Sequence, residues 1–530
     1  MDVGYFINCI VKWWGQLSYT AWMYYALLLP VTALIYQLVG KEKRKYVLLA
    51  GSWFFFFSLS GLLLIANIVS SVFVWLMGRW LDAISSDKSI KRKARKRKKK
   101  KALALGVVIL LLTLVGFKYL DFLGLSIVRI TQGIGIPFDW RMLDLIAPVG
   151  ISYYTLEAIA YLSDVYWEKT EADKNFLNVA LFMSFFPKLI EGPMTRYGEM
   201  GELFCGEPVN AENLSRGYQR ILWGLFKKLV IADQLAPAVS AVYGGEYMDG
   251  GVALFAGLIF TIQEYMDFSG AIDIAIGSAM IFNVKLPENF KQPFFAKNAS
   301  DFWRRWHITL GRFFRDYIFY PVSVSKWVSK LSNGVKKIFG ENVGYSVIPF
   351  VSLFLVWLSN GLWHGPRWTY VFYGMYYFVL IFIENILEKP FLRLLERISL
   401  KETSWTVRIF RYVKLLFIVI IGEMIFRADS LGKGIHMVKC IFTDLKFEMV
   451  IKNLENINID RYGYFPIIIG CIVVMIVETL KEAGYPIRAK IESLPVPVRY
   501  AFWYGCIFFV IIFGAYGAGY DAEDLIYAQF

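Results

Sequence analysis

The chain has 530 residues, of which 57% are hydrophobic and 18% aromatic, and its formal net charge is +14. Soluble domains are about 45–50% apolar. This composition, with its many long uncharged runs, therefore excludes an ordinary soluble domain and indicates a polytopic membrane protein. The five cysteines are scattered and contain no Cys-x-x-Cys pair, which suggests neither a disulfide framework nor a metal site.

Two basic clusters set the expected orientation. Lys41–Lys45 holds four basic residues, and Lys88–Lys101 is a polybasic tract directly before an apolar run. The positive-inside rule places both in cytoplasmic loops, where the tract could also contact anionic lipid. Nucleic-acid binding is the alternative for such a tract, but apolar segments flank it closely.

The first spans follow from length and these charges. Residues 5–14 are expected to form an interfacial start, and Tyr19–Val39 is long enough to span the membrane. Tyr46–Ile84 is long enough for two crossings, which return the chain to the cytoplasm. Ala102–Leu120 then crosses outward, and Ile146–Val165 crosses back.

Two other apolar segments are interrupted. Glycines and Pro137 break Gly124–Asp144, and Pro187 breaks Phe176–Ile190. Proline cannot donate the helical hydrogen bond, and non-helical backbone at membrane depth must be buried in protein or line a cavity. We therefore expect broken or re-entrant helices at these places.

Charged residues mark the next apolar segments. Leu214–Val242 carries four basic residues and is expected to be tilted or interfacial. Gly250–Val284 contains Glu264, Asp267 and Asp273. Carboxylates at such depth should face a cavity or pair with a cation, and the sequence leaves both readings open.

Lys285–Lys337 carries 11 basic residues against three carboxylates, which is typical of a cytoplasmic face with amphipathic helices at the membrane. Five apolar runs follow, namely Val343–Leu362, Trp368–Leu387, Trp405–Phe426, Tyr464–Leu480 and Tyr500–Tyr516. With about eleven apolar segments, the expected fold is an all-α polytopic membrane protein with broken or re-entrant helices around a central tunnel.

His364 is the first candidate for chemistry among the three histidines. It ends a long apolar run, and an ionisable group in a membrane segment is a functional candidate by default. A buried imidazole can act as a general base near neutral pH, and Gly365 beside it permits close approach of a ligand. The structural alternative is a hydrogen-bonded histidine at a helix end that takes no part in chemistry. His436 is expected to be an ordinary polar loop residue.

His307 ends the stretch Asp301–His307, which holds three aromatic residues and two arginines. On one continuous helix, Trp303, Trp306 and Leu310 would share a face. Such a surface could hold phosphates and an adenine ring, or it could be an interfacial belt with snorkelling arginines. The candidate donor-binding residues are Trp303, Arg304, Arg305, Trp306, Trp363 and Asp267.

Short motifs occur in order along the chain: Pro148–Thr155, Ser163–Tyr166, Ser184–Pro187 with Gly192-Pro193, Asp267–Gly270, Leu286–Phe290, Phe302–Leu310, Arg315–Tyr317, Gly361–Gly365, Phe426–Ser430 and Ile526–Phe530. Together they resemble the bacterial branch of the membrane-bound O-acyltransferase family. The length and Phe426–Ser430 are more similar to members that O-acetylate alginate than to shorter members that D-alanylate teichoic acid. The chain departs from the family pattern at Lys188 and Glu191, which puts any site role of that turn in doubt.

The resemblance implies that His364 is the catalytic histidine and that His307 is a second functional residue. It implies no bound cofactor and an acyl donor that is acetyl-CoA or a carrier-protein thioester. The acceptor would be a cell-surface polymer or a hydroxyl of an extracytoplasmic, esterase-like partner protein. Residues 1–101 would form N-terminal transmembrane helices, and residues 102–530 a catalytic membrane domain. Cytoplasmic Arg304, Arg305, Arg312 and Arg315 would attract the donor phosphates.

Two other classes of function fit the residues alone. A transporter or flippase would also place polar groups inside the membrane, but it usually shows internal repeats, and none is evident. A non-catalytic scaffold for the cell envelope would tolerate the loss of both histidines.

Overall fold

The computed structural model describes residues 18, 19, 21, 23–245, 248–446, 450 and 464–516. Within this part of the chain there are helices and no strand, which confirms the all-α expectation. Six of the described helical stretches are long and apolar enough to cross a membrane: Lys41–Ser86, Arg92–Lys118, Glu341–His364, Trp368–Arg397, Tyr464–Glu482 and Val496–Phe513. The expected interfacial start at 5–14 and the motif Ile526–Phe530 lie outside the described residues.

The chain packs as two compact units. The first holds the described residues up to Ile221 together with Ala271–Pro287, and the second holds Leu222–Gly270 and the described residues from Glu288 onward. The domain division expected between residues 101 and 102, and the central tunnel, concern the membrane arrangement and stay predictions.

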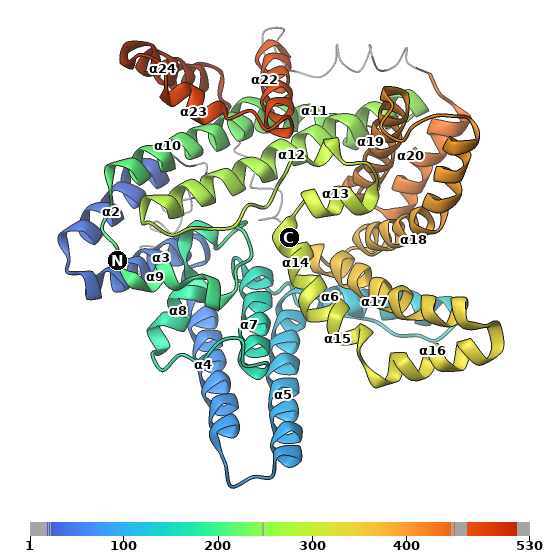
Figure 1. The fold of residues 1–530 in the computed structure, drawn as a ribbon, viewed down its shortest axis with the longest axis horizontal. Coiled ribbons are helices and arrows are strands. Elements are labelled where there is room, and N and C mark those ends of the chain that lie inside the picture. Colours follow the sequence, from blue (N-terminus) through green and yellow to red (C-terminus); the bar gives the residue numbers. More distant parts are fainter. Residues whose placement is uncertain are drawn as a thin grey trace. The chain divides into compact units, whose positions relative to one another are not determined.

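The helices of the first unit are α2 (Leu29–Leu38), α3 (Arg44–Ser60), α4 (Leu64–Ser86), α5 (Arg92–Lys118), α6 (Leu120–Gly133), α7 (Ile151–Tyr166), α8 (Phe176–Ser184), α9 (Gly201–Cys205), most of α10 (Ala211–Leu225) and the end of α12 (Gly250–Ile281). In this unit α4 packs against α5, α7 and α8 (Figure 1). α7 is buried along nearly its whole length.

Two breaks interrupt the apolar segments of this unit. Gly61, with a φ of 52°, separates α3 from α4, so Tyr46–Ile84 holds two helices, and its two expected crossings stay a prediction. α8 ends at Ser184, and Pro187 lies in a short 3-10 turn just after it. The reason is local: glycine adopts positive φ readily, and proline withholds a backbone donor.

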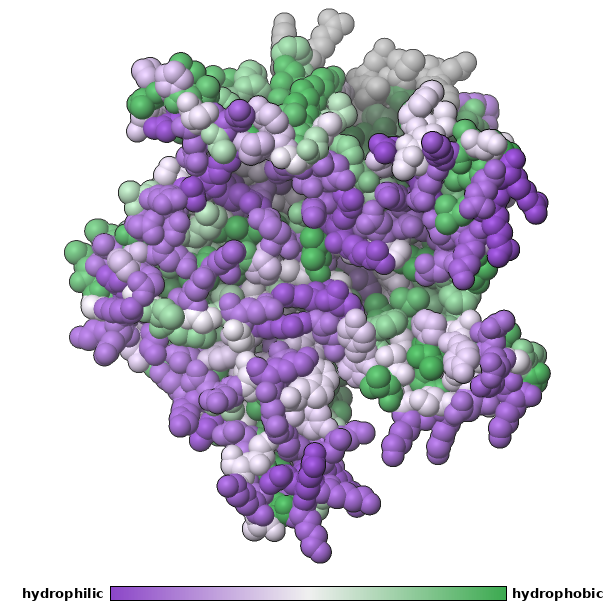
Figure 2. All heavy atoms as spheres, viewed as in Figure 1, coloured by the Kyte–Doolittle hydropathy of each residue, from purple (hydrophilic) through white to green (hydrophobic). Residues whose placement is uncertain are grey.

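The polybasic tract, which we expected in a loop, lies largely on a helix. Residues from Arg92 onward form the first turns of α5, because lysine and arginine favour helix and the apolar run continues the same helix. Lys99 is buried, and its Nζ lies 2.8 Å from Oε1 of Glu168. Figure 2 shows hydrophilic side chains gathered where α4 ends and α5 begins.

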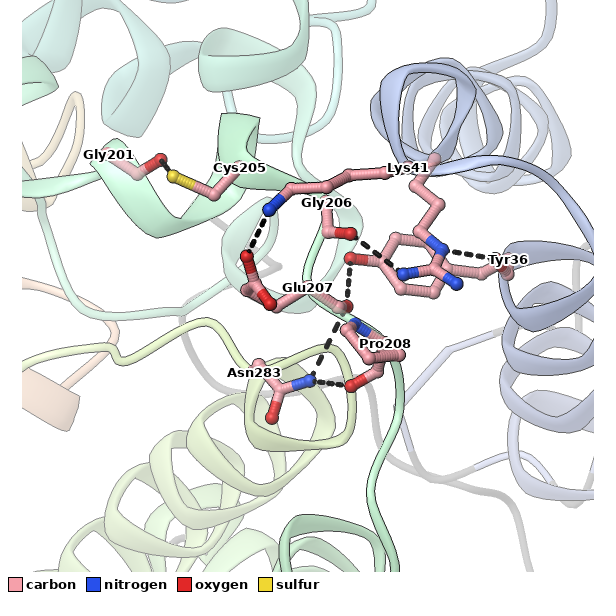
Figure 3. A network of polar contacts seen from close by, with 9 residues as sticks. Tyr36, Lys41, Gly201, Cys205, Gly206, Glu207, Pro208 and Asn283 are labelled. Atoms are coloured by element: carbon pink, nitrogen blue, oxygen red, sulfur yellow. Dashed lines mark hydrogen bonds and ion pairs between the residues drawn. The ribbon is translucent and has the colours of Figure 1, made fainter.

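A polar network ties the loop after α9 to the N-terminal helices of the same unit (Figure 3). Lys41 Nζ pairs with Oε1 of Glu207 at 2.6 Å. Arg44 donates to the carbonyl oxygen of Gly206 at 2.9 Å, and the Tyr36 hydroxyl donates to the carbonyl oxygen of Glu207 at 2.9 Å. The network thus holds the first basic cluster against this loop.

The second unit begins with the end of α10 and the start of α12. Its other helices are α11 (Asp233–Gly244), α13 (Ala299–Arg305), α14 (Ile308–Phe314), α15 (Tyr320–Ser323), α16 (Lys326–Phe339), α17 (Glu341–His364), α18 (Trp368–Arg397), α19 (Trp405–Arg427), α20 (Leu431–Thr443), α22 (Tyr464–Glu482), α23 (Ile487–Glu492) and α24 (Val496–Phe513). α17 packs against α16 and α18, α18 against α19, and α19 against α20. His436 lies on α20 and not, as expected, in a loop.

Candidate active site

The chain turns sharply at His307, and the continuous helix that we expected across this residue is absent. α13 ends at Arg305, Trp306 is extended, and His307 adopts a left-handed conformation with a φ of 47° before α14 begins. Asn289 supplies the hydrogen bonds that a continuous helix would have made. Its backbone carbonyl accepts from Ile308 N at 3.0 Å, so a long-range partner overrides the local helical pattern.

The side chain of Asn289 also determines which nitrogen of His307 carries the proton. Asn289 Oδ1 accepts from the backbone N and the hydroxyl of Thr309, at 3.0 and 2.9 Å, and it lies 3.3 Å from His307 Nδ1. Because this oxygen only accepts, Nδ1 of the neutral ring is the donor and Nε2 is the ring's acceptor. Burial, reinforced by the nearby His364, lowers the pKa of His307 well below its usual range.

His364 is the last residue of α17 and is only 3% exposed. Its imidazole lies among aromatic rings, with centroid distances of 5.1 Å to Phe426, 5.9 Å to Tyr373 and 6.3 Å to Tyr370. Gly365 then ends the helix with a φ of 152°, which favours glycine. The fold therefore places a buried imidazole against an aromatic wall.

Trp363 joins the two histidines. Its ring centroid lies 5.1 Å from that of His364 and 5.5 Å from that of His307. Phe268 of α12 covers His307 from another side at 4.8 Å. The fold thus brings together two histidines that stand 57 positions apart in the chain, as the numbering shows.

A close approach of α17 and α18 sets the position of His364. A Cβ added at Gly374 would lie 2.2 Å from the carbonyl oxygen of Trp357, and one added at Gly361 would lie 2.5 Å from that of Tyr370. Only glycine fits at either position. Small residues of this kind let helix backbones approach closely, which brings Tyr370 and Tyr373 against His364.

A buried acidic group beside this wall was not singled out by our sequence analysis. The Tyr373 hydroxyl donates to Oε1 of Glu423 on α19 at 2.7 Å. Glu264, which we had noted only as a carboxylate on an apolar segment, is also buried, at 1% exposed. A signal for Glu423 was present, since it is the one carboxylate within the apolar run from Leu415 to Phe426.

The predicted donor residues lie in different surroundings. Trp303 packs against Tyr373 at 6.1 Å and so borders the wall around His364. Trp306 is buried and stacks on Phe302 at 5.5 Å. Arg304 is exposed. Arg305, by contrast, forms ion pairs, with its Nη1 2.8 Å from Glu482.

Asp267 lies in a buried cluster of charges rather than in the aromatic wall. It forms an ion pair with Lys228, whose Nζ also lies 2.7 Å from Oδ1 of Asp233. Lys228 and Asp267 are 2% and 1% exposed at their side chains. This arrangement is the structural reading that the sequence had left open, and the donor-binding role of Asp267 stays a prediction.

The departure from the family pattern at Lys188 also has a structural partner. In the first unit, Lys188 Nζ lies 2.5 Å from Oε2 of Glu157, and both side chains are buried. The other oxygen of Glu157 accepts from the backbone N and the hydroxyl of Thr195, both at 3.0 Å. The buried lysine therefore fastens the broken-helix turn.

Comparisons with known proteins identify the family of this chain. A model of the membrane-bound O-acyltransferase (MBOAT) family matches residues 170–333, a stretch that includes His307. The chain is 30% identical over 435 residues to the probable alginate O-acetylase AlgI of Pseudomonas aeruginosa, which covers 82% of this chain and 76% of that protein.

Two other relatives have names that state a different acceptor polymer. The chain is 32% identical over 357 residues to the peptidoglycan O-acetyltransferase of Helicobacter pylori, covering 62% of each protein. It is 28% identical over 253 residues to the teichoic acid D-alanyltransferase of Bacillus subtilis, covering 46% of this chain and 61% of that protein. The chain therefore belongs to the membrane-bound O-acyltransferase family and is an integral membrane O-acyltransferase.

Proposed function

We propose that this chain moves an acetyl group from a cytoplasmic thioester to a hydroxyl group outside the cytoplasm, with His364 as the general base. The observation that carries the proposal is the place of His364, which is buried at the end of α17 between Trp363 and an aromatic wall. A neutral imidazole is a suitable base for a hydroxyl proton. The names of the alginate and peptidoglycan relatives support acetyl as the group.

The proposed reaction conserves protons. His364 accepts the proton of the acceptor hydroxyl while the hydroxyl oxygen attacks the thioester carbonyl. The carbon–sulfur bond then breaks, and the thiolate takes the proton from His364, so the products are an ester and a free thiol. His307, oriented by Asn289, assists in proton transfer or substrate orientation. A covalent acyl-histidine is the alternative order of steps.

The donor is proposed to be acetyl-CoA or a carrier-protein thioester, used as substrate and not held as a cofactor. Exposed Arg304 and Arg315 would attract its phosphates together with Arg312. Trp303 would present a ring between this basic segment and Tyr373. Arg305 is already paired with Glu482, so its contribution to donor binding is expected to be smaller.

The acceptor is proposed to be a cell-surface polysaccharide, reached directly or through a secreted, esterase-like partner. The chain would lie in the bacterial cytoplasmic membrane with Lys88–Lys101 facing the cytoplasm. D-alanyl transfer to teichoic acid is the second candidate, supported by the 28% identity to the Bacillus subtilis D-alanyltransferase. That reaction would take D-alanine from a carrier-protein thioester.

The test measures base-labile ester on the cell-envelope polymers of a deletion strain complemented with wild type or His364→Ala, and identifies the released acid by mass. We expect acetate with wild type and none with the variant, at equal protein levels in the membrane. Release of alanine would replace acetyl by D-alanyl transfer. Equal ester in both strains would exclude His364 as the base.

A further inference from the structure

α16 carries two exposed stripes of side chains that run next to each other along the helix. The apolar stripe consists of Trp327, Leu331 and Ile338, which are 52%, 46% and 75% exposed. The basic stripe consists of the exposed residues Lys326, Lys330 and Lys337. Each lysine directly precedes one of the three apolar residues, so both sets have the spacing i, i+4 and i+11. At 3.6 residues per turn, each set falls on one side of the helix, and the two stripes are about 100° apart.

A third side of α16 packs against α17. Val328 and Ser332 are buried, and the Ser332 hydroxyl donates to the carbonyl oxygen of Gly344 at 2.7 Å. A Cβ added at Gly344 would lie 2.5 Å from the Cβ of Lys336, so the two helices touch at this point. α17 is one of the helices that are long and apolar enough to cross a membrane. The buried side of α16 is therefore fastened to a candidate span, while both stripes stay exposed.

The polarity of α16 changes around the helix and not along it. A helix that crosses a bilayer is apolar over about 20 residues and polar at its ends. α16 has 14 residues, and lysines stand in its first, second and last turns, each beside an apolar residue. A boundary between water and hydrocarbon that suits both stripes must run parallel to the helix axis. This is the arrangement of a helix that lies in the plane of a membrane surface.

The charge of the basic stripe favours anionic phospholipid as the occupant. α16 contains no acidic residue. Its fourth lysine, Lys336, pairs with Glu341 at 2.5 Å, whereas the basic stripe forms no ion pair with a described residue. Lysines beside an apolar helix face can extend their charged ends to the headgroup layer. Because the cytoplasmic leaflet carries acidic lipids, it attracts such a stripe.

The structure narrows the expected membrane-surface segment to this helix. The sequence predicted amphipathic helices within Lys285–Lys337. In α13 and α14, however, the large apolar side chains of Phe302, Leu310 and Phe314 are buried in the second unit, so they are not available to a lipid layer. Val324, by contrast, is 79% exposed and extends the apolar stripe ahead of α16. In Figure 2 apolar and hydrophilic side chains lie next to each other over α16.

We propose that α16 lies in the surface of an anionic membrane leaflet, with its apolar stripe among the acyl chains and its basic stripe on the phosphates of acidic phospholipids. The occupant of this face is thus membrane lipid and not a protein partner. Lipid bound here would hold the start of α17 at the membrane surface, because Ser332 joins the two helices. This membrane contact is independent of the chemistry proposed at His364.

Photo-crosslinking from within α16 tests the apolar stripe. The full chain, with p-benzoylphenylalanine in place of Leu331, is reconstituted into vesicles of equimolar phosphatidylglycerol and phosphatidylcholine. Irradiation should join this side chain to an acyl chain, and mass spectrometry of the adduct identifies the lipid.

Two positions provide controls for this crosslink. The same group in place of Asn333, which is exposed on the opposite side of α16, should give little lipid adduct. In place of Phe350, which is 41% exposed on the candidate span α17, it should give a lipid adduct and so serves as the positive control.

The ratio of the two lipids in the adduct tests the basic stripe. A lysine near an anionic surface strengthens the attraction by about fivefold, so phosphatidylglycerol should exceed phosphatidylcholine in the adduct at position 331. The variant that combines Lys326→Gln, Lys330→Gln and Lys337→Gln should bring the ratio toward one and keep the wild-type melting temperature, because these lysines are exposed. The matched control combines Lys93→Gln, Lys96→Gln and Lys100→Gln. It removes the same charge from exposed positions of α5 and should leave the ratio unchanged.

Three results would contradict this membrane contact. A protein adduct, or no adduct, at position 331 while position 350 reacts with lipid would overturn the contact itself. Equal lipid adducts at positions 331 and 333 would show a helix surrounded by lipid and would overturn the in-plane orientation. An unchanged lipid ratio in the α16 variant, or an equal change in the α5 variant, would overturn the selectivity of the basic stripe for anionic lipid.

Discussion

The side-chain oxygen of Asn289 lies 3.3 Å from Nδ1 of His307, across a break between two short helices. The same oxygen caps α14 through Thr309. One asparagine therefore sets both the backbone turn that presents His307 and the tautomer of its ring. Any chemistry at His307 therefore depends on Asn289, which does not itself react.

Replacing Asn289 by alanine should cost both stability and activity. The change leaves the Thr309 donors and His307 Nδ1 without their acceptor, which costs about 1–3 kcal/mol for a buried group. We expect a lower melting temperature in detergent and a loss of ester formation per folded molecule. Asn298→Ala is the control, since it removes a helix cap at α13, costs about 1 kcal/mol and leaves His307 untouched. Normal turnover by Asn289→Ala would contradict the role given to this residue.

His307→Gln should lower ester formation without abolishing it. Loss of one group that assists proton transfer typically costs on the order of 10²-fold, whereas His364→Ala should leave no measurable transfer. The measurement is the initial rate of ester formation at matched protein level. His436→Gln provides the control, because His436 is exposed on α20 and is the chain's third histidine. A rate for His307→Gln equal to that of His436→Gln would make His307 purely structural.

Gly374→Ala should push α17 and α18 apart. The new Cβ would lie 2.2 Å from the Trp357 carbonyl oxygen, and relief of such a clash costs about 1–3 kcal/mol. Because this contact brings Tyr373 to His364, we expect a fall in both melting temperature and rate. Gly116→Ala on α5 meets nothing within 4 Å and should be neutral or slightly stabilising. Equal behaviour of the two variants would refute the packing argument.

Lys228→Met should destabilise the protein strongly, because it removes the cation that pairs with the buried Asp267 and the partly buried Asp233. Breaking a buried ion pair from one side costs about 3–5 kcal/mol. The double variant with Asp267→Asn should recover part of that loss, as measured by thermal unfolding. Asp267→Asn alone separates the two readings of this carboxylate: a raised KM for acetyl-CoA at an unchanged melting temperature would assign Asp267 to donor binding.

Much of the helical layout could be predicted because its signals are local. Apolar runs of sufficient length gave the cores of α17 and α18, and the break near Pro187 follows from the missing donor of proline. His364 also stood out locally, since an ionisable group at the end of an apolar run is unusual. Even so, the polybasic tract was misassigned to a loop, because lysine and arginine signal topology and favour helix at the same time.

What only the tertiary structure decided are the pairings between distant residues. The break at His307 depends on Asn289, and the helical periodicity around His307 cannot indicate a partner from another segment. The ion pair of Asp267 with Lys228 and the hydrogen bond from Tyr373 to Glu423 likewise depend on which faces of separate helices meet. The sequence shows that these polar and charged groups lie in apolar segments, where burial without a partner is unfavourable. Which partner each group finds depends on how the helices pack together.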